Sequence, residues 1–302
     1  MLPNCGIFCG EPVPTAPENA LVVIPAPGFR QPAEPPPLCE VHALPVIHSD
    51  GCPLHVQIDG PEGAPVLMLS NSLGVNLSMW EPQLAPLTWQ FRLVRYDRRG
   101  HGSSGVTPGP YTMEQLARDD LAIMDALGLA KVNFCGISMG GMVAQWLGAF
   151  APERIDKLIL SNTSCHYPLK DPWNDRIKTI REHGIGAIAD TVLGIWFTKN
   201  FHAREPETIK RFRAMMVSTP LEGYIGCAAA VRDMDHRDVV TKIKLPTLLI
   251  AGRHDNSTTV EAAEFIRDRI PGAKFTVLDA AHISSVEQAS AFNAEVLGFL
   301  KP

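Results

Sequence analysis

The sequence predicts an α/β protein with a mostly parallel sheet, helices on both faces of the sheet and an inserted helical lid. Two observations carry this prediction. From Val46 onward, apolar runs of about four to six β-forming residues alternate with stretches of helical period, as in parallel strands joined by helical crossovers. Between Ser164 and about Val240 the alternation stops and helical patterns follow one another. Helices inserted after a strand are typical of a lid over the carboxyl edge of such a sheet, where ligands bind.

The strands are expected from short runs rich in β-branched and aliphatic residues. They are Leu54–Ile58, Val66–Leu69, Phe91–Tyr96, Val132–Cys135, Leu158–Leu160, Thr247–Ile250 and Lys274–Leu278. Helices are expected between them, from apolar residues that recur every three or four positions. They are Met113–Leu127, Met139–Phe150 and Val260–Ile270. The second ends near Pro152, because proline cannot continue a helix.

The expected lid contains several helices and no clear strand. Its helices are Trp173–His183, Ile185–Trp196, Glu207–Val217 and Leu221–Met234. After residues 1–44 the chain is therefore expected to divide into three parts. They are a first part of the core over residues 45–163, a helical lid over 164–240 and a second part of the core over 241–302.

Residues 1–44 differ from the rest of the chain. They are dense in proline, including Pro32 and the run Pro35–Pro37, and they show no hydrophobic period. Proline removes backbone donors and fixes φ, so we expect a disordered extension here and neither a helix nor an inner strand. An upstream start codon and a proline-rich binding arm stay open as alternative explanations of this stretch.

Charge and cysteine content limit the classes of function. The 302 residues carry a net charge of −5, from 27 Lys and Arg against 32 Asp and Glu, which argues against nucleic acid or an anionic membrane as the main partner. No apolar run approaches the roughly 20 residues that span a bilayer. The seven scattered cysteines include no Cys-x-x-Cys pair, so neither a disulfide framework nor a zinc site is expected. The first basic residue is Arg30, whereas a secretory signal begins with a positively charged segment, so no such signal is expected. We expect a cytoplasmic protein that acts on a small molecule, and we leave its oligomeric state open.

The sharpest motif is Gly136-Ile137-Ser138-Met139-Gly140. It follows one expected strand and opens one expected helix. A serine in a tight strand-to-helix turn needs neighbours without side chains, and Gly136 and Gly140 meet that need. The turn exposes the serine hydroxyl beside a helix N-terminus. Ser138 is therefore the predicted nucleophile.

A nucleophilic serine needs a base and an acid, which in this arrangement follow it in the order acid, then histidine. His282 comes just after the last expected strand, at the carboxyl edge of the sheet, and Asp255 follows the strand before it. Asp279 competes with Asp255, but it is only three residues from His282. The other histidines considered fall in the expected lid: His166, His183, His202 and His236. The predicted triad is Ser138, Asp255 and His282.

An acyl-transfer site also needs N–H donors for the oxyanion. One is expected from Met139, the residue after the nucleophile, and the other from the loop after an earlier strand. That loop is Ser70-Asn71-Ser72-Leu73-Gly74, whose small polar residues suit a backbone that approaches a ligand closely. Leu73 is the expected second donor, with Ser72 lining the site.

The run from Tyr96 to Gly102, Tyr-Asp-Arg-Arg-Gly-His-Gly, is charged and rich in glycine. We interpret it as structural, because Asp97 at a strand end can bond the N–H groups of the loop and Arg98 can pair locally. Its glycines form no Walker loop, and no Gly-x-Gly-x-x-Gly opens a helix after the first strand, so a nucleotide cofactor is not expected.

Together these residues resemble the α/β-hydrolase fold superfamily from about Val46 to Leu300, and within it the 3-oxoadipate enol-lactonases. The serine turn and the histidine segment are shared by many hydrolases. The Ser-Asn-Ser-Leu-Gly loop at 70–74 and the run Arg-Asp-Met-Asp at 232–235 are more specific to the lactonases. Further matching segments are Trp196-Phe197-Thr198 and Glu287-Gln288. The proline-rich residues 1–44 have no counterpart in the family.

The resemblance implies a carboxylic ester hydrolase that opens 3-oxoadipate enol-lactone with water to give 3-oxoadipate, in the β-ketoadipate pathway of aromatic catabolism. It implies no metal or organic cofactor. Two alternatives stay open: another carboxylic ester hydrolase of the same fold, and a non-catalytic ligand-binding receptor on this fold. Dehalogenases and epoxide hydrolases need an aspartate where Ser138 stands.

The implied lactone carries a free carboxylate, which needs a cationic partner when it is buried under a lid. Candidates in the lid and at its exit are Arg204, Arg211, Arg213, Arg232 and Arg237. Arg232 is favoured, because it lies near the end of the helix that returns to the sheet edge and belongs to the lactonase-like run. A salt bridge from Arg232 to Asp233 is the alternative. Trp146 and Trp196 are candidates for the pocket wall, with core packing as the alternative for each.

Overall fold

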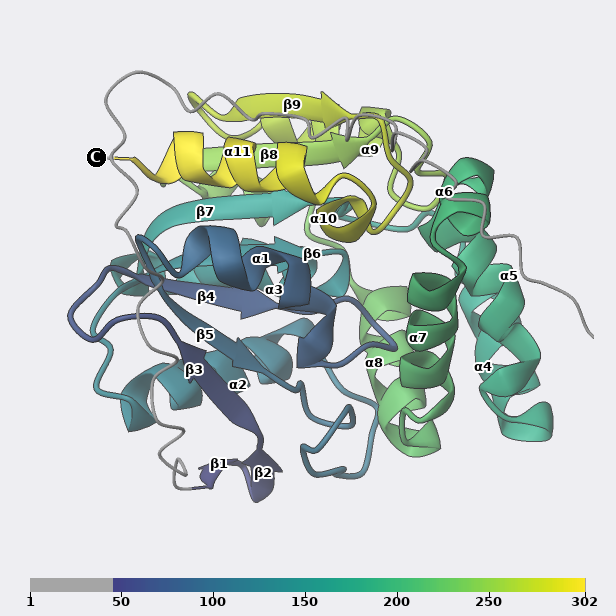
Figure 1. The fold of residues 1–302 in the computed structure, drawn as a ribbon. Helices are drawn as coiled ribbons and strands as arrows, with labels where there is room; N and C mark the ends of the chain where they lie inside the picture. The colour runs from purple at the N-terminus through teal and green to yellow at the C-terminus, as the bar shows by residue number, and fades with distance from the viewer. Residues whose placement is uncertain (1–45, 302) are drawn as a thin grey trace, which may run out of the picture. The chain divides into compact units, whose positions relative to one another are not determined.

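A seven-stranded sheet is the centre of the computed structural model, which describes residues 46–301 (Figure 1). In spatial order its strands are β3 (Val56–Asp59), β5 (Arg92–Tyr96), β4 (Val66–Ser70), β6 (Val132–Ile137), β7 (Ile155–Ser161), β8 (Thr247–Gly252) and β9 (Lys274–Leu278). β3 runs antiparallel to β5, and each other neighbouring pair is parallel. The expected mostly parallel sheet is confirmed, whereas the expected disordered extension over 1–44 lies outside the described residues.

Helices cover both faces of this sheet (Figure 1). On one face lie α1 (Glu81–Leu87), α10 (Ser284–Glu287) and α11 (Ala289–Leu300), and on the other lie α2 (Met113–Ala126), α3 (Met139–Phe150) and α9 (Val260–Arg267). Every residue of β6 and of β8 is buried, as expected for strands covered on both sides. Within the described part of the chain, no helix is long and apolar enough to cross a membrane.

The chain between β7 and β8 is helical, and we call α4–α8 the helical insertion. Its helices are α4 (Asp171–His183), α5 (Gly186–Trp196), α6 (Lys199–Arg204), α7 (Pro206–Val217) and α8 (Leu221–Asp233). They stand beyond the carboxyl ends of the parallel strands, toward which the arrowheads point in Figure 1. The expected helices of this region are present within two residues of their expected bounds. α6 is an addition, since six residues are too few to show a helical period in the sequence.

The first described residues form a hairpin that the sequence analysis missed. In place of one strand over Leu54–Ile58, β1 (Ile47–Ser49) pairs with β2 (Cys52–Leu54), and β3 begins two residues later. Asp50 and Gly51, which join the two strands, have φ of 45° and 73°. A type I′ turn requires positive φ at both positions, and Asp-Gly is one of its usual sequences, so this dipeptide was a signal available from the sequence.

All three helices on one face of the sheet, α1, α10 and α11, are also absent from the expectations. α1 contains Pro82 and Pro86, which obscure a helical pattern in the sequence. α11 packs against α1, and its apolar residues, including Phe292 and Val296, are buried there. Short 3-10 helices cover Leu77–Trp80, Pro152–Arg154 and Val240–Lys242.

The start of α3 lies directly on the end of β4. A Cβ on Gly140 would lie 2.2 Å from the carbonyl oxygen of Ser70, and a Cβ on Gly136 would lie 2.2 Å from the carbonyl oxygen of Gly140. Neither position has room for a side chain. The turn between β6 and α3 is therefore in direct backbone contact with the chain that leaves β4.

Gly140→Ala tests this contact. The added methyl group overlaps backbone atoms that have little freedom to move, so we expect the free energy of unfolding to fall by about 3 kcal/mol, at the upper end of the usual cost of overpacking. Gly194→Ala is the matched control, because Gly194 lies inside α5 with nothing within 4 Å of the added Cβ. It should gain about 0.5–1 kcal/mol from helix propensity. Denaturant unfolding measures both, and equal effects would contradict the close approach.

Candidate active site

Ser138 occupies a tight turn between β6 and α3. Its φ of 56° and ψ of −118° are rare for a residue with a side chain, and such a conformation costs about 1–3 kcal/mol and persists only where its surroundings enforce it. Two hydrogen bonds from the end of β7 do so. The Ser138 N–H donates to the Ser161 carbonyl over 2.9 Å, and the Thr163 hydroxyl donates to the Ser138 carbonyl over 2.8 Å. The hydroxyl of Ser138 is thereby held at the N-terminus of α3.

The structure brings the three residues of the predicted triad together. The Nε2 atom of His282 lies 2.8 Å from the Ser138 hydroxyl oxygen, and its Nδ1 atom lies 2.7 Å from Oδ2 of Asp255. Ser138 is 8% exposed, Asp255 4% and His282 3%. The carboxylate can only accept, so Nδ1 carries a hydrogen and Nε2 is free to accept the hydroxyl proton. This arrangement can deprotonate a serine and so prepare it to attack a carbonyl carbon.

Asp255 is held as a carboxylate by its surroundings. Burial raises its pKa, but the neighbouring His282 and the bonds from Thr258 outweigh burial and lower the pKa to about 2. The backbone N–H groups of Ser257 and Thr258 donate to Oδ1, and the Thr258 hydroxyl donates to Oδ2 over 2.6 Å. Asp255 is therefore ionised and fixed in orientation, as the partner of a histidine base must be.

Asn162 links the ends of three neighbouring strands. It follows β7 with φ of 42°, and its side chain donates to Oδ2 of Asp255 and to the carbonyl of Ala281, each over 3.1 Å. Its own amide oxygen accepts from the hydroxyls of Ser161 and Ser284. The acid after β8 and the histidine after β9 are thus registered against the end of β7. The sequence analysis did not identify this residue, because its role depends on contacts between distant segments.

The alternatives to the predicted acid and base lie elsewhere. Asp279 forms an ion pair of 2.8 Å with His254 at the surface. His202 bonds the Leu193 carbonyl, and His236 is buried near the return of the helical insertion. Among residues 46–301, no group of three or more His, Cys, Asp or Glu is arranged to hold a metal ion.

The loop that carries His282 is tied to the helical insertion. The carboxylate of Glu287 accepts from the N–H of Ala281 over 2.9 Å and from the hydroxyl of Thr198. The N–H of Ile283 donates to the carbonyl of Trp196 over 3.0 Å. These bonds lie on either side of His282 in the chain. The segment around Trp196 and the loop around His282 therefore hold each other in place.

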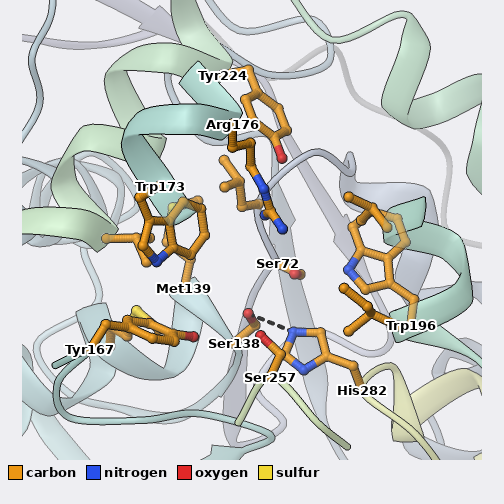
Figure 2. A pocket seen from close by; sticks show the side chains of 15 residues that line it. Ser72, Ser138, Met139, Tyr167, Trp173, Arg176, Trp196, Tyr224, Ser257 and His282 are labelled. Atoms are coloured by element: carbon orange, nitrogen blue, oxygen red, sulfur yellow. Dashed lines mark hydrogen bonds between the residues drawn. The ribbon is translucent and has the colours of Figure 1, made fainter. Parts of the chain in front are cut away.

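A pocket opens above Ser138 and His282 (Figure 2). Of the residues predicted for the site, Ser72, Leu73, Met139 and Trp196 line it together with Ser138 and His282. Lining residues that the sequence analysis missed are Tyr167, Trp173, Arg176, Tyr224 and Ser257. The pocket thus combines aromatic walls with several polar side chains, among them Ser138, Arg176 and His282.

Arg176 is the cation that the structure places in this pocket. It comes from α4, and Figure 2 shows its guanidinium between Trp173 and Trp196, directed toward Ser138 and His282. The guanidinium carbon lies 4.6 Å from the centre of the Trp173 ring. No Asp or Glu within residues 46–301 forms an ion pair with Arg176. Arg176 is half-buried, and a guanidinium in a pocket without a carboxylate partner among residues 46–301 is suited to an anionic group of a ligand.

The preference for Arg232 as the cation of the pocket is wrong. Arg232 donates to both carboxylate oxygens of Asp233 and to the amide oxygen of Asn174, and it does not line the pocket. The other candidate arginines also pair with acids: Arg204 with Glu205, Arg211 with Glu81, Arg213 with Asp190 and Arg237 with Asp235. Their charges are neutralised outside the pocket.

A sequence signal for Arg176 existed. Trp173, Ile177 and Ile180 recur at the spacing of an inward helix face, and Ile177 and Ile180 are buried. Arg176 lies three residues after Trp173 and so shares this face. An arginine on the inward face of a lid helix is more informative than one beside an acidic neighbour in the chain.

Trp146 does not line the pocket either. It lies eight residues after Ser138 in α3, which is about 12 Å along the helix at about 1.5 Å per residue. Its ring contacts Phe150, one helical turn further on, with ring centres 5.1 Å apart. For Trp146 the packing alternative is therefore correct, whereas Trp196 faces the pocket (Figure 2).

Comparisons with known proteins agree with this geometry. Residues 65–289 match the family model of the alpha/beta hydrolase fold. The chain is 37% identical over 264 residues to 3-oxoadipate enol-lactonase 1 of Acinetobacter baylyi, covering 87% of this chain and 99% of that relative. It is 39% identical over 242 residues to 3-oxoadipate enol-lactonase 2 of the same organism, covering 80% of this chain and 91% of that relative.

A solved structure extends the likeness from sequence to fold. The crystal structure of the enol-lactonase from Burkholderia xenovorans LB400 matches with a TM-score of 0.82 and 43% identity, over 83% of this chain and 97% of that chain. The family model covers well over half of the chain, and the relatives are matched over nearly their whole lengths. The chain belongs to the alpha/beta hydrolase fold family, and within it to the family of the 3-oxoadipate enol-lactonases.

Proposed function

We propose that this protein is a serine hydrolase that opens 3-oxoadipate enol-lactone with water to give 3-oxoadipate. The observation that carries the proposal is the hydrogen-bonded chain from Ser138 through His282 to Asp255, beneath a pocket that contains Arg176, which forms no ion pair with an acid among residues 46–301. Relatives named 3-oxoadipate enol-lactonase support the substrate. A carboxylic ester hydrolase needs the hydrogen-bonded chain of serine, histidine and acid, and binding of an anionic lactone needs the arginine.

The first half of the reaction forms an acyl-enzyme. His282 takes the hydroxyl proton of Ser138, and the serine oxygen attacks the lactone carbonyl carbon. The bond between that carbon and the ring oxygen then breaks, and His282 returns the proton to the departing enol oxygen. Because the lactone is cyclic, the enol stays attached to the acyl group and tautomerises to the ketone.

The second half releases the product. His282 takes a proton from a water molecule, and the resulting hydroxide attacks the ester carbon on Ser138. Collapse of the tetrahedral intermediate returns the proton from His282 to the serine oxygen and frees 3-oxoadipate. Asp255 stabilises the imidazolium in both halves and keeps Nδ1 as the protonated nitrogen. No step of this sequence calls for a metal or organic cofactor.

The oxyanion of both tetrahedral intermediates needs two N–H donors. Met139 begins α3, so its N–H is one of the free donors at a helix N-terminus. Leu73 lies in the loop after β4 and lines the same pocket. We assign the backbone N–H groups of Leu73 and Met139 to this role, with Ser72 beside them. Each donor of this kind lowers the barrier by about 3 kcal/mol.

The acetate group of the lactone is the anion that fits Arg176. The helical insertion acts as a lid in this proposal, because α4 and α5 bring Arg176, Trp173 and Trp196 over the reacting carbonyl. An enzyme of this kind serves aromatic catabolism in the β-ketoadipate pathway. We also propose that the protein is cytoplasmic, because buried free thiols such as Cys135 and Cys227 stay reduced there.

Ser138→Ala should remove at least about 10³-fold of kcat on the enol-lactone, since the remaining groups supply only residual catalysis. The fold should be unchanged, because alanine fits the space of serine. Steady-state kinetics measures the loss, and a fluorophosphonate should label the wild type and not the variant. Turnover above about a tenth of the wild type would rule out a serine nucleophile, and binding without wild-type turnover would favour a receptor.

Asp255→Asn should leave the pocket intact and lower kcat by roughly 10³–10⁴-fold, as loss of the orienting carboxylate does in other serine hydrolases. The amide oxygen can still accept from the N–H groups of Ser257 and Thr258, so the loop should keep its shape. The uncharged amide no longer stabilises an imidazolium. A variant with wild-type kcat would require another acid, such as Asp279.

Arg176→Met should lower kcat/KM for the enol-lactone by roughly 10²-fold, equivalent to about 2.7 kcal/mol, and change it less than about threefold for a neutral ester such as 4-nitrophenyl acetate. Arg232→Met is the matched control, because Arg232 comes from the same helical insertion and already pairs with Asp233. It should change neither substrate appreciably. Equal losses on both substrates for Arg176→Met would mean that the residue supports the lid and does not bind the carboxylate.

A further inference from the structure

The loop that follows β4 is hydrogen-bonded to the segment that follows β5. The side chain of Asn71 donates to the Tyr96 carbonyl over 2.9 Å, the N–H of Gly74 donates to Nε2 of His101 over 2.9 Å, and the N–H of Leu77 donates to Asp97 over 2.8 Å. All three bonds are buried. The segment that the sequence analysis interpreted as structural therefore holds the loop that carries Leu73.

The bond to His101 differs from the other two because its donor, the N–H of Gly74, belongs to the residue next to Leu73. His101 is fully buried, and its Nδ1 atom lies 3.3 Å from the Arg99 carbonyl. A carbonyl can only accept, so Nδ1 carries the hydrogen and Nε2 presents its lone pair to the Gly74 N–H. Burial lowers the pKa of His101 to about 4, with Arg98 acting in the same direction and Asp97 in the opposite one. The imidazole is thus neutral, as an acceptor must be.

The bond at Gly74 fixes the peptide unit on the carboxyl side of Leu73. Gly74 has φ of 82°, and a Cβ there would lie 3.0 Å from the Tyr224 ring. The N–H of Leu73 belongs to the preceding peptide, so once His101 holds the Leu73–Gly74 peptide, only the φ and ψ rotations of Leu73 separate this held unit from that N–H. Without an acceptor, the buried Gly74 N–H would be unsatisfied, which favours rotation of this peptide.

We propose that His101 is a positioning residue that aims the N–H of Leu73 at the oxyanion by accepting a hydrogen bond from Gly74. The inference rests on the proposed role of Leu73 in the oxyanion hole. His101 does not line the pocket above Ser138, so its loss should weaken binding of the transition state and leave binding of the ground state unchanged. Such a change lowers kcat while KM stays constant.

The test compares His101→Gln with His101→Met. Both are unbranched side chains of similar length, but only glutamine offers an oxygen that can accept from the Gly74 N–H. Kinetics are measured with the enol-lactone and with 4-nitrophenyl acetate, per active site titrated with a fluorophosphonate, alongside the thermal midpoint. The aryl ester decides the inference about His101 even if the lactone proves not to be the substrate, because both reactions form an oxyanion.

We expect His101→Met to lower kcat at least about tenfold on both substrates, a part of the 10²–10³-fold that loss of a whole donor costs, with KM within about twofold. His101→Gln should stay within about threefold of the wild type. Affinity for an alkylboronic acid, which adds to Ser138 and resembles the tetrahedral intermediate, should fall in parallel with kcat. A merely structural histidine would not produce this parallel loss.

His236→Met is the matched control. His236 is also a buried histidine, 6% exposed, with a pKa that burial lowers to about 4, but it lies at the return of the helical insertion. Its kcat should match the wild type within about twofold. The proposal is overturned if His101→Met keeps wild-type kcat, if both His101 variants lose kcat in step with their thermal midpoints, or if neither folds. If the wild type turned over neither substrate, the proposed function would be contradicted, and with it the role of Leu73 in the oxyanion hole.

Discussion

The active site depends on one strained turn, in which Ser138 sits between β6 and α3 with positive φ. The turn directs the serine hydroxyl away from the sheet. Backbone contacts with neighbouring segments stabilise the strained conformation of this turn. Gly140 supplies one such contact by lying directly on Ser70 at the end of β4. The same contact brings the loop after β4 beside the helix N-terminus. One close approach therefore sets both the nucleophile and the two chain segments that can bind an oxyanion.

The other two residues of the triad are positioned by the ends of neighbouring parallel strands. Parallel strands end at one edge of a sheet, so segments far apart in the chain meet there. Asn162 after β7 contacts both the Asp255 carboxylate after β8 and the Ala281 carbonyl after β9. A buried amide can do this because its nitrogen carries two hydrogens, one for each of these acceptors. The acid and the base are thus aligned by a residue that takes no part in proton transfer.

In the proposed function, substrate selectivity comes from the helical insertion and not from the sheet. The sheet edge supplies chemistry that would serve any ester, whereas α4 and α5 supply Arg176, Trp173 and Trp196 above it. Glu287 and the bond from Ile283 to Trp196 connect this cover to the His282 loop. The pocket wall and the loop of the proposed base are therefore joined by hydrogen bonds. Among the described residues Arg176 has no acid partner, while other arginines of the insertion do. This difference supports Arg176 as the part of the pocket that binds an anion in the proposed function.

The sequence by itself predicted the fold class and most of the strands and helices, because their patterns are local. The order of residues along the chain and their place after strands predicted the residues of the proposed triad. Alternating strand and helix periods, and a serine between two glycines at a strand–helix junction, need no knowledge of distant contacts. The Asp50-Gly51 hairpin was equally local and was overlooked. The tertiary structure alone decided which arginine faces the pocket. Arg232 and Arg176 both lie on helices of the insertion, and only packing shows that one is neutralised by Asp233 and the other is directed toward Ser138. It also decided the roles of Asn162 and His101, since a hydrogen bond between segments distant in the chain has no signature in either segment.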